Sequence, residues 1–323
     1  MRSDVMAFFK LTRPFSYVGY FETEHQKELL QEIKGEIQTG GLIAISGMVG
    51  CGKTTLLYRL QADLQQAPNV LVSRSLAVDK DRVNLTTLMT ALFYDLATEK
   101  DFKLPTQTEK RERKLITLIQ KHRKLIALFV DEAHDLHYQT LVKLKRLIEL
   151  VRYNGGSLAV ILAGHPKLKN DLRRPSLEEI GARASLFTLQ GIQGSQKEFI
   201  HWLLKQCTQA KTAPTDLLSE AAIALLSERL TTPLQIEQYL TMAFEETYKA
   251  GQKTVTPEVI EMVLAQGLDD LEPRLIRHGY NAKVIAKLLN VRPTVVRSFL
   301  HGQLPPGRTQ DLKQQMLQMG IPV

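Results

Sequence analysis

Residues 47–54 combine glycine, lysine and threonine at the spacing of a loop that binds phosphate. In one-letter code they read GMVGCGKT, which fits the pattern G-x4-G-K-[ST] between an apolar run and the start of a helix. Glycine permits positive φ, so the backbone at Gly47, Gly50 and Gly52 can turn its N–H groups inward around an anion. We expect Lys53 to reach the β- and γ-phosphates and the Thr54 hydroxyl to ligate Mg²⁺. The segment predicts an ATP site with nucleotide contacts from Gly47, Gly50, Cys51, Gly52, Lys53, Thr54 and Thr55.

A pair of acidic residues supplies the second half of this chemistry. Asp131 and Glu132 follow six apolar residues, 125–130, which fit a buried parallel strand. Ligands bind at the carboxyl ends of such strands, so Asp131 is placed to hold Mg²⁺, directly or through water. Glu132 is placed to orient and deprotonate the water that attacks ATP. Such a pair could instead cap a helix, but the phosphate loop earlier in the chain favours the catalytic interpretation.

Alternating strand and helix patterns predict the scaffold that positions these groups. We expect a parallel α/β core over residues 20–190, followed by a helical lid over residues 195–266. The aromatic residues of segment 6–20 could pack on an adenine ring or in a hydrophobic core. The predicted domains are residues 1–192, 193–268 and 269–323. The predicted strands are residues 42–45, 70–73, 125–130, 158–163 and 185–189, and the helices of the core are residues 22–39, 85–98, 107–122 and 134–153.

The chain beyond residue 270 carries most of the net charge. The formal charge of the whole chain is +8, and residues 271–323 hold eight Lys or Arg against two acidic residues. This asymmetry points to an anionic partner, most simply nucleic acid. Residues 282–290 and 293–301 read as two short helices around a tight turn, typical of a helix-turn-helix. Thr294, Arg297 and Ser298 would lie on the helix that contacts bases, although short helix pairs also occur as plain packing units.

Cysteine content and hydropathy bear on the location of the protein. The two cysteines, Cys51 and Cys207, suggest neither a disulfide framework nor a zinc site. The first ten residues lack a secretion signal, and no apolar run approaches the roughly 20 residues of a membrane helix. We therefore expect a soluble, cytoplasmic protein with no membrane partner.

Four short motifs carry a family resemblance. They are FFKL at residues 8–11, YFET at 20–23, DEAH at 131–134 and AGHP at 163–166. With these motifs, residues 6–265 resemble AAA+ ATPases of the ExeA type, a group that includes transposition helpers similar to TnsC, TniB and the phage Mu B protein. The resemblance implies an ATPase that assembles as a ring or filament on double-stranded DNA and helps a partner transposase to select its target. A secretion-pathway ATPase of the ExeA type and an ATP-gated transcriptional regulator are the alternatives.

The resemblance also implies roles for single positions. His165 stands at the sensor-one position, where a polar side chain contacts the γ-phosphate or the attacking water, although a packing histidine would also fit there. Arg183 resembles the arginine finger donated to a neighbouring subunit, with Arg173 and Arg174 as competitors. The lid position that usually carries an arginine after a proline holds Leu234, so the resemblance implies no sensor-two contact.

Basic residues of the core are the expected contacts with duplex DNA. Lys80 and Arg82, on the loop after the second strand, are the first choice, and Arg111 and Lys143 follow. Contacts of this kind go to phosphates and carry no base information directly. A charged helix face is often merely solvated, which is the alternative for the segment around Arg111. Thr294 and Arg297 of the tail would add a separate contact, either with DNA or with a transposase.

Overall fold

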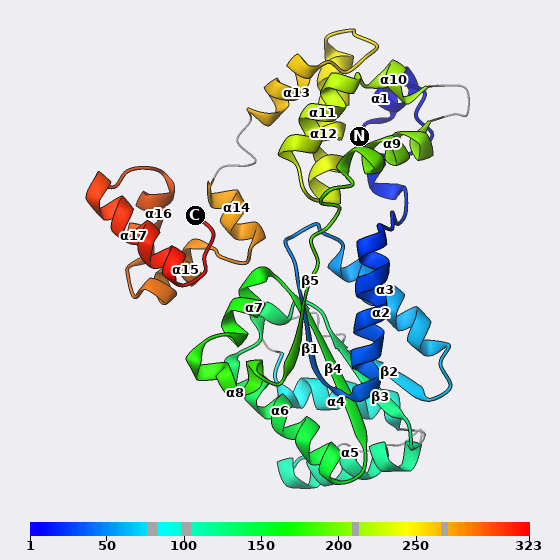
Figure 1. The fold of residues 1–323 in the computed structure, drawn as a ribbon, viewed down its shortest axis with the longest axis vertical. Helices are drawn as coiled ribbons and strands as arrows, with labels where there is room; N and C mark the ends of the chain where they lie inside the picture. The colour runs from blue at the N-terminus through cyan, green and yellow to red at the C-terminus, as the bar shows by residue number, and fades with distance from the viewer. Residues whose placement is uncertain (76–82, 98–104, 209–212, 266–270) are drawn as a thin grey trace. The chain divides into compact units, whose positions relative to one another are not determined.

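The computed structural model describes residues 1–75, 83–97, 105–208, 213–265 and 271–323, which form two compact units (Figure 1). The sheet unit comprises His25–Gly47 and Lys53–Leu189. The helical unit comprises Met1–Glu24, Met48–Gly52 and Gln190–Val323. The tip of the phosphate loop thus groups with the helical unit, whereas the strand before it and the helix after it belong to the sheet unit.

The sheet unit is built on five parallel strands in the order β2-β3-β4-β1-β5, which confirms the predicted parallel α/β core. Ser46 at the end of β1 pairs with Gly164 at the end of β4, and Val130 at the end of β3 pairs with Leu162 of β4. The segments that follow β1, β3 and β4 therefore emerge at one edge of the sheet. The strands are β1 Gly41–Ser46, β2 Val70–Arg74, β3 Leu125–Val130, β4 Ser157–Gly164 and β5 Ala184–Thr188.

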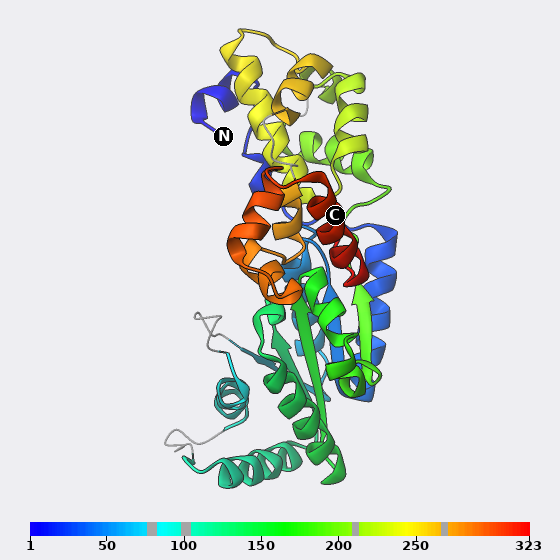
Figure 2. The same cartoon turned by 90° about the vertical axis from the view of Figure 1, so that its left-hand side faces the viewer.

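Helices cover both faces of this sheet, which explains why β3 and β4 are apolar along nearly their whole length. In Figure 2, α4, α5 and α6 lie on one side of the strands and the blue α2 lies on the other. The central strands are thereby sealed from water on both sides. The helices of the sheet unit are α2 Glu24–Thr39, α3 Lys53–Gln65, α4 Leu85–Leu96, α5 Thr108–His122, α6 Tyr138–Tyr153, α7 Pro166–Leu172 and α8 Glu178–Gly181.

The helix predicted over residues 134–153 begins only at Tyr138, because the chain turns sharply after β3. Glu132 adopts a left-handed conformation with φ of 54°, and a 3-10 turn, Ala133–Asp135, follows it. The ring of His137 then caps α6 by accepting the N–H of Gln139 at 3.3 Å. The acidic pair is therefore held by a turn, and the helix-capping interpretation does not hold for α6.

A hydrophobic core shared by the amino-terminal segment and the lid helices organises the helical unit. Phe9 and Phe15 are buried edge-on against Phe244 of α12, with ring centroids 4.8 and 5.2 Å from it. Phe9 and Phe15 thus pack in the lid core, the second of the two predicted possibilities, whereas Tyr17 is exposed. The elements are α1 Ser3–Phe8, η1 Phe15–Tyr17, α9 Gln196–Cys207, α10 Pro214–Leu217, α11 Glu220–Arg229, α12 Pro233–Lys249 and α13 Pro257–Leu264.

Four helices close around a small separate core at the carboxyl end of the chain. α15 Ala282–Leu289 and α16 Pro293–Leu300 occupy the positions predicted for the helix-turn-helix, and Asn290 ends α15 in the left-handed conformation. α14 Leu271–Arg277 and α17 Pro306–Gln318 complete this core, which the two predicted helices could not close alone. No helix in the described parts of the chain is long and apolar enough to cross a membrane.

Candidate nucleotide-binding site

The phosphate loop has the predicted left-handed backbone at two of its three glycines. φ is +80° at Gly50 and +98° at Gly52, but Gly47 is not in the left-handed region, so the prediction was wrong there. The N–H of Gly47 instead donates to the carbonyl of Gly164 at 3.1 Å, which keeps this residue bonded to the end of β4. In the loop tip, the N–H of Cys51 donates to the carbonyl of Met48 at 3.3 Å.

Lys53, Thr54 and Asp131 meet at the carboxyl edge of the sheet. The Lys53 side chain is buried, and its Nζ donates to the carbonyl of Gly47 at 2.9 Å. The Thr54 hydroxyl donates to Asp131 Oδ2 at 2.8 Å. Neighbouring oxygens in an octahedral Mg²⁺ shell lie about 3 Å apart, since each bond is about 2.0–2.1 Å long. The spacing of these two oxygens therefore fits one Mg²⁺ ion.

Glu132 faces two histidines beside this pair. Its Oε2 lies 3.3 Å from His134 Nδ1 and 3.7 Å from His165 Nε2. The two imidazole rings stack, with centroids 3.7 Å apart and planes inclined by 21°. All three residues offer ligand atoms within 4.8 Å of one another, so they can contact the same bound water or ion. Sequence analysis gave His134 no role, although its place two residues after Glu132 was a signal.

Thr54 and the acidic pair line a cavity of about 290 Å³. Thr54, Asp131 and Glu132 supply polar groups of its wall, and the end of β3 and the turn after it supply Val130 and Leu136. A hydroxyl and two carboxylates at the mouth of a parallel sheet can hold a cation and polarise water. The remaining lining residues are Ser75 and Val83.

The imidazole of His165 is neutral near pH 7. Burial is the main cause that lowers its pKa, to about 4, and the charges of His134 and Lys53 lower it further. The carboxylates of Glu132 and Asp135 act in the opposite direction but do not prevail. A neutral ring can donate one hydrogen bond and accept another, so it can orient water without adding charge. The predicted sensor-one role needs only such a polar contact.

Protonation of His165 provides a pH test of this environment. In the unfolded chain the ring titrates near 6.5, whereas in the fold it stays neutral down to about pH 4. The unfolded state binds the extra proton between these values, so stability falls as the pH is lowered from 7 to 5. We expect His165→Asn to remove about 1 kcal/mol of this pH dependence, after allowance for solvent screening, in urea unfolding at both pH values. Equal pH dependence in variant and wild type would contradict the assignment.

Arg183 lies at the opposite edge of the sheet from the acidic pair. It precedes β5 directly, and a strand of five residues spans about 17 Å. Its Nη1 donates to Glu149 Oε1 at 2.5 Å, while 63% of the side chain is exposed. Of its competitors, Arg173 is exposed and Arg174 is held in a salt bridge on its own helix turn. Because Arg183 cannot reach the acidic pair of its own sheet, a role as arginine finger requires a second subunit.

Two of the predicted DNA contacts lie in one cavity of the sheet unit. Arg111 of α5 and Lys143 of α6 line a cavity of about 580 Å³ together with Arg146. The Arg111 guanidinium also makes hydrogen bonds within the protein: it donates to the carbonyl of Pro105 at 3.0 Å and to the hydroxyl of Thr86 at 3.1 Å. Lys143 and Arg146 are exposed and carry the accessible charge of this cavity.

The other predicted DNA contacts lie either in the tail or in a segment outside the described residues. Thr294 and Arg297 are both exposed on α16, the second helix of the helix-turn-helix. Lys80 and Arg82 lie outside the described residues. The tail positions are thus accessible to a large partner, as the prediction requires.

Part of the sheet unit is similar to a known family of domains. Residues 35–172 match the family described as AAA domain. The chain is similar to general secretion pathway protein A of Aeromonas hydrophila, with 29% identity over 179 residues. That match covers 51% of this chain and 29% of the relative, so the chain spans less than a third of the relative's length.

Solved structures share the fold across nearly the whole chain. Cdc6p of Pyrobaculum aerophilum has a TM-score of 0.56 at 16% identity, covering 98% of this chain and 84% of that one. The ORC2 protein of Aeropyrum pernix, in ADPNP and ADP complexes, has a TM-score of 0.57 at 12% identity, covering 96% and 91%. The ORC1 protein of the same organism, in complex with DNA, has a TM-score of 0.51 at 14% identity, covering 97% and 89%. The fold is an α/β P-loop fold with a parallel-sheet core, followed by a helical lid.

Proposed function

We propose that this chain is an ATP-dependent DNA-binding ATPase that assembles on duplex DNA as a ring or filament and regulates target selection by a partner transposase. The observation that carries the ATPase part is the convergence of Lys53, Thr54, Asp131 and Glu132 at one edge of a parallel sheet. The match to the AAA domain supports nucleotide hydrolysis in general.

In the proposed reaction, Lys53 exchanges its bond to the Gly47 carbonyl for the β- and γ-phosphates of ATP. Thr54 and Asp131 would hold Mg²⁺, which neutralises charge on the phosphates when bound. Glu132 accepts a proton from the attacking water, and the neutral imidazole of His165 holds that water in place. As the water oxygen bonds to the γ-phosphorus, the bond from that phosphorus to the bridging oxygen breaks and ADP leaves.

Support for DNA binding comes from two separate basic surfaces. Lys143 and Arg146 are exposed at one cavity of the sheet unit, and Arg297 is exposed on a helix-turn-helix of the tail. Phosphate contacts of such residues bind duplex DNA with little sequence preference, whereas a helix of this kind can also reach base edges. A structure similar in fold, the ORC1 protein, is described in complex with DNA.

Duplex binding should weaken steeply with salt and should depend on both surfaces. We expect Lys143→Ala/Arg146→Ala and Lys80→Ala/Arg82→Ala each to weaken binding and to lower the salt slope by about 0.9 per lost phosphate contact. Fluorescence anisotropy of a labelled duplex between about 50 and 200 mM salt measures this. Lys249→Ala, which removes a surface charge of the lid, serves as the control.

The outcome also separates the proposal from a transcriptional regulator. Loss of all binding in Thr294→Ala/Arg297→Ala, with no effect of the four core substitutions, would overturn the proposed mode of binding. An operator-binding regulator would then be the better interpretation, because the tail helix alone would carry the contact. The same tail variant is expected to retain non-specific duplex binding if the core surface contributes.

A second candidate is an ATPase of a secretion pathway. The similarity to general secretion pathway protein A favours it, although the match covers 29% of that protein. Such a role predicts ATP hydrolysis without any response to duplex DNA. Wild-type protein that hydrolyses ATP but binds no duplex at low salt would therefore favour the secretion candidate.

A further inference from the structure

Glu132, His134 and His165 form a cluster of metal-ligand atoms within the sheet unit. Among the residues that the structure describes, these three offer ligand atoms that all lie within 4.8 Å of one another. Glu132 Oε2 is 3.3 Å from His134 Nδ1 and 3.7 Å from His165 Nε2. Ligand atoms of a tetrahedral Zn²⁺ ion lie about 3.3–3.6 Å apart, since its bonds to nitrogen and oxygen are about 2.0–2.2 Å long. The cluster therefore has nearly the size that such an ion requires.

Backbone contacts bring the two histidines of this cluster together. The left-handed φ of 54° at Glu132 turns the chain after β3 toward the end of β4. A Cβ added at Gly164 would lie 3.0 Å from the backbone nitrogen of His134, so the glycine permits this close approach. Lys167 Nζ donates to the carbonyl of His134 at 3.2 Å, and its charge is paired with Asp171 at 2.7 Å. The turn is thus fixed to β4 and α7 by contacts within the protein.

The two imidazole rings have to turn before they can bind one ion. They stack with centroids 3.7 Å apart and planes inclined by 21°, whereas a bound metal ion lies in the plane of each ligating ring. Rotation about χ2 of histidine is soft, because this torsion has broad energy wells. The backbone can therefore stay in place while the rings turn toward the ion.

The charge around the cluster favours a cation. Asp135 Oδ1 lies 3.6 Å from His134 Nε2, the nitrogen that does not face Glu132. A carboxylate behind a ligating imidazole orients the ring and raises its basicity. Asp131 adds a third carboxylate beside Glu132, and the ammonium of Lys53 is near enough to act on this site. Three carboxylates against one ammonium leave a formal charge of −2.

The ligand atoms distinguish this cluster from the predicted Mg²⁺ site. Thr54 and Asp131 offer only oxygen atoms, which Mg²⁺ prefers. Two imidazoles with one carboxylate instead suit transition-metal ions such as Zn²⁺ and leave a fourth position open. The two neighbouring sites therefore select different ions.

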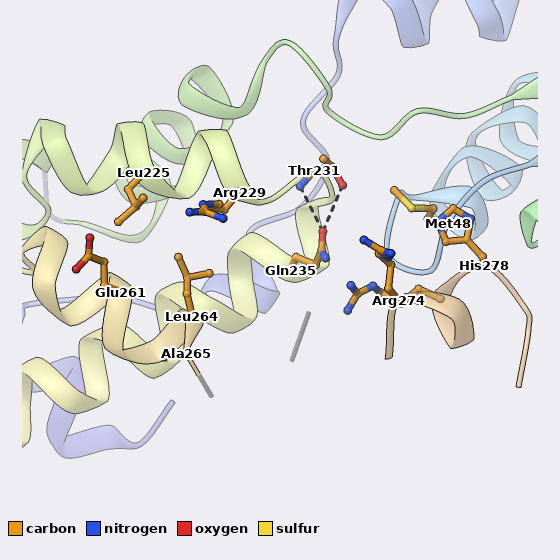
Figure 3. A pocket seen from close by; sticks show the side chains of 11 residues that line it. Met48, Leu225, Arg229, Thr231, Gln235, Glu261, Leu264, Ala265, Arg274 and His278 are labelled. Atoms are coloured by element: carbon orange, nitrogen blue, oxygen red, sulfur yellow. Dashed lines mark hydrogen bonds between the residues drawn. The ribbon is translucent and has the colours of Figure 1, made fainter. Parts of the chain in front are cut away.

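A cavity of about 600 Å³ in the helical unit has the opposite charge (Figure 3). Arg229, Arg274 and Arg277 line it against the carboxylate of Glu261. A guanidinium group carries hydrogen-bond donors and no acceptor, so it cannot ligate a cation. His278, which also lines this cavity, therefore has positively charged neighbours. Of the two places, the cluster in the sheet unit is the one that favours a metal ion.

We propose that Glu132, His134 and His165 bind a divalent transition-metal ion of the Zn²⁺ class, and that the bound ion inhibits ATP hydrolysis. A carboxylate that ligates such an ion is a weaker base for the attacking water, and a ligated His165 no longer holds that water. Lys53 and Thr54 remain available to the nucleotide, so ATP stays bound. The binding of the ion follows from the cluster alone, whereas its inhibitory effect rests on the proposed ATPase function.

The first test measures Zn²⁺ binding to the full-length protein by competition with a fluorescent chelator, in excess Mg²⁺ and without nucleotide. We expect one tight site per chain. His134→Ala should weaken it about a hundredfold or more, because even an outer-shell partner contributes about 10–100-fold, and Asp135→Asn should weaken it about tenfold. His201→Ala is the matched control, since His201 lies 3.9 Å from one carboxylate, that of Glu220. Wild-type protein that binds no Zn²⁺, or binds it no better than His134→Ala does, would overturn the inference.

The second test measures phosphate release in saturating Mg²⁺ and ATP while Zn²⁺ is added. At a free Zn²⁺ concentration of about ten times the Kd, about nine-tenths of the chains are occupied, so the wild-type rate should fall about tenfold. A zinc-selective chelator should restore it. His134→Ala, compared with its own zinc-free rate, should need about a hundredfold more Zn²⁺, whereas His201→Ala should behave as the wild type. Unchanged or faster hydrolysis with Zn²⁺ bound would overturn the proposed inhibition.

The two tests separate this inference from the proposed function. Wild-type protein that hydrolyses no ATP would overturn the proposed function, while binding of Zn²⁺ that depends on His134 would still support the metal site. Thermal unfolding monitored by circular dichroism shows whether each variant is folded. Co²⁺ bound to the wild-type protein keeps the test decisive if a variant is not, because a four-coordinate Co²⁺ site absorbs visible light far more strongly than the hydrated ion. A spectrum equal to that of hydrated Co²⁺ would contradict the proposed site.

Discussion

ATP binding is expected to fall at least about a hundredfold in Lys53→Ala and to persist in Glu132→Gln. Lys53 is buried at the loop, and its Nζ donates to the Gly47 carbonyl at 2.9 Å. In the proposed reaction this ammonium contacts phosphates already in the ground state. In the proposed reaction Glu132 acts on the attacking water, so its loss should lower hydrolysis by about 10²–10⁴-fold while leaving affinity nearly unchanged. Equilibrium titration with fluorescent ATP and a phosphate-release assay measure the two effects.

A matched lysine substitution makes this comparison specific. Lys121→Ala removes an exposed lysine near the end of α5 and should change neither quantity. Equal ATP affinity in Lys53→Ala and wild type would contradict the assignment of the site. Hydrolysis that continues at the wild-type rate in Glu132→Gln would show that another group activates the water.

Hydrolysis is expected to fall by about 10³–10⁵-fold in Arg183→Ala, because a finger stabilises charge that develops on the transferred phosphate. The position of Arg183 at the amino end of β5 requires that this contact be made in a second subunit. Mixing Arg183→Ala with Lys53→Ala subunits should therefore restore part of the activity, since some interfaces then pair an intact loop with an intact arginine. Phosphate release across a series of mixing ratios measures the rescue.

The competing arginine provides the comparison for this experiment. Arg173→Ala mixed with Lys53→Ala should show no such rescue if Arg183 is the finger. Absence of rescue at every ratio, with assembly intact by sedimentation, would indicate that Arg183 has the structural role suggested by its salt bridge with Glu149.

The chemistry of the sheet unit could be predicted because it depends on local pattern. The glycine spacing around Lys53 and the acidic pair after an apolar strand each imply a position at the carboxyl ends of strands. The sheet order then brings Thr54 and Asp131 within hydrogen-bond distance. The two short helices of the tail could also be predicted from sequence, since an apolar pattern marks both of them, and the structure then shows that Asn290 ends α15 in the left-handed conformation.

The features of the site that the sequence did not predict depend on contacts between segments distant in the chain. The left-handed Glu132 delays α6 and stacks His134 on His165, a geometry set by the turn and by β4 together. The N–H of Gly47 donates to the carbonyl of Gly164, so the backbone of Gly47 follows the pairing of the sheet. The presence of a glycine at this position therefore did not predict its φ. Likewise, no pattern indicated that Arg277 would bond to Val49 of the phosphate loop.

Nucleotide-dependent binding to duplex DNA tests the central claim most directly. Anisotropy of one labelled duplex should be measured with wild-type protein in ATP, in ADP and without nucleotide, and with Lys53→Ala in ATP. We predict that ATP tightens wild-type binding about tenfold or more over ADP, because assembly places many basic surfaces on one duplex. Lys53→Ala in ATP should match the nucleotide-free wild type. Equal duplex affinity in all four conditions would contradict the account.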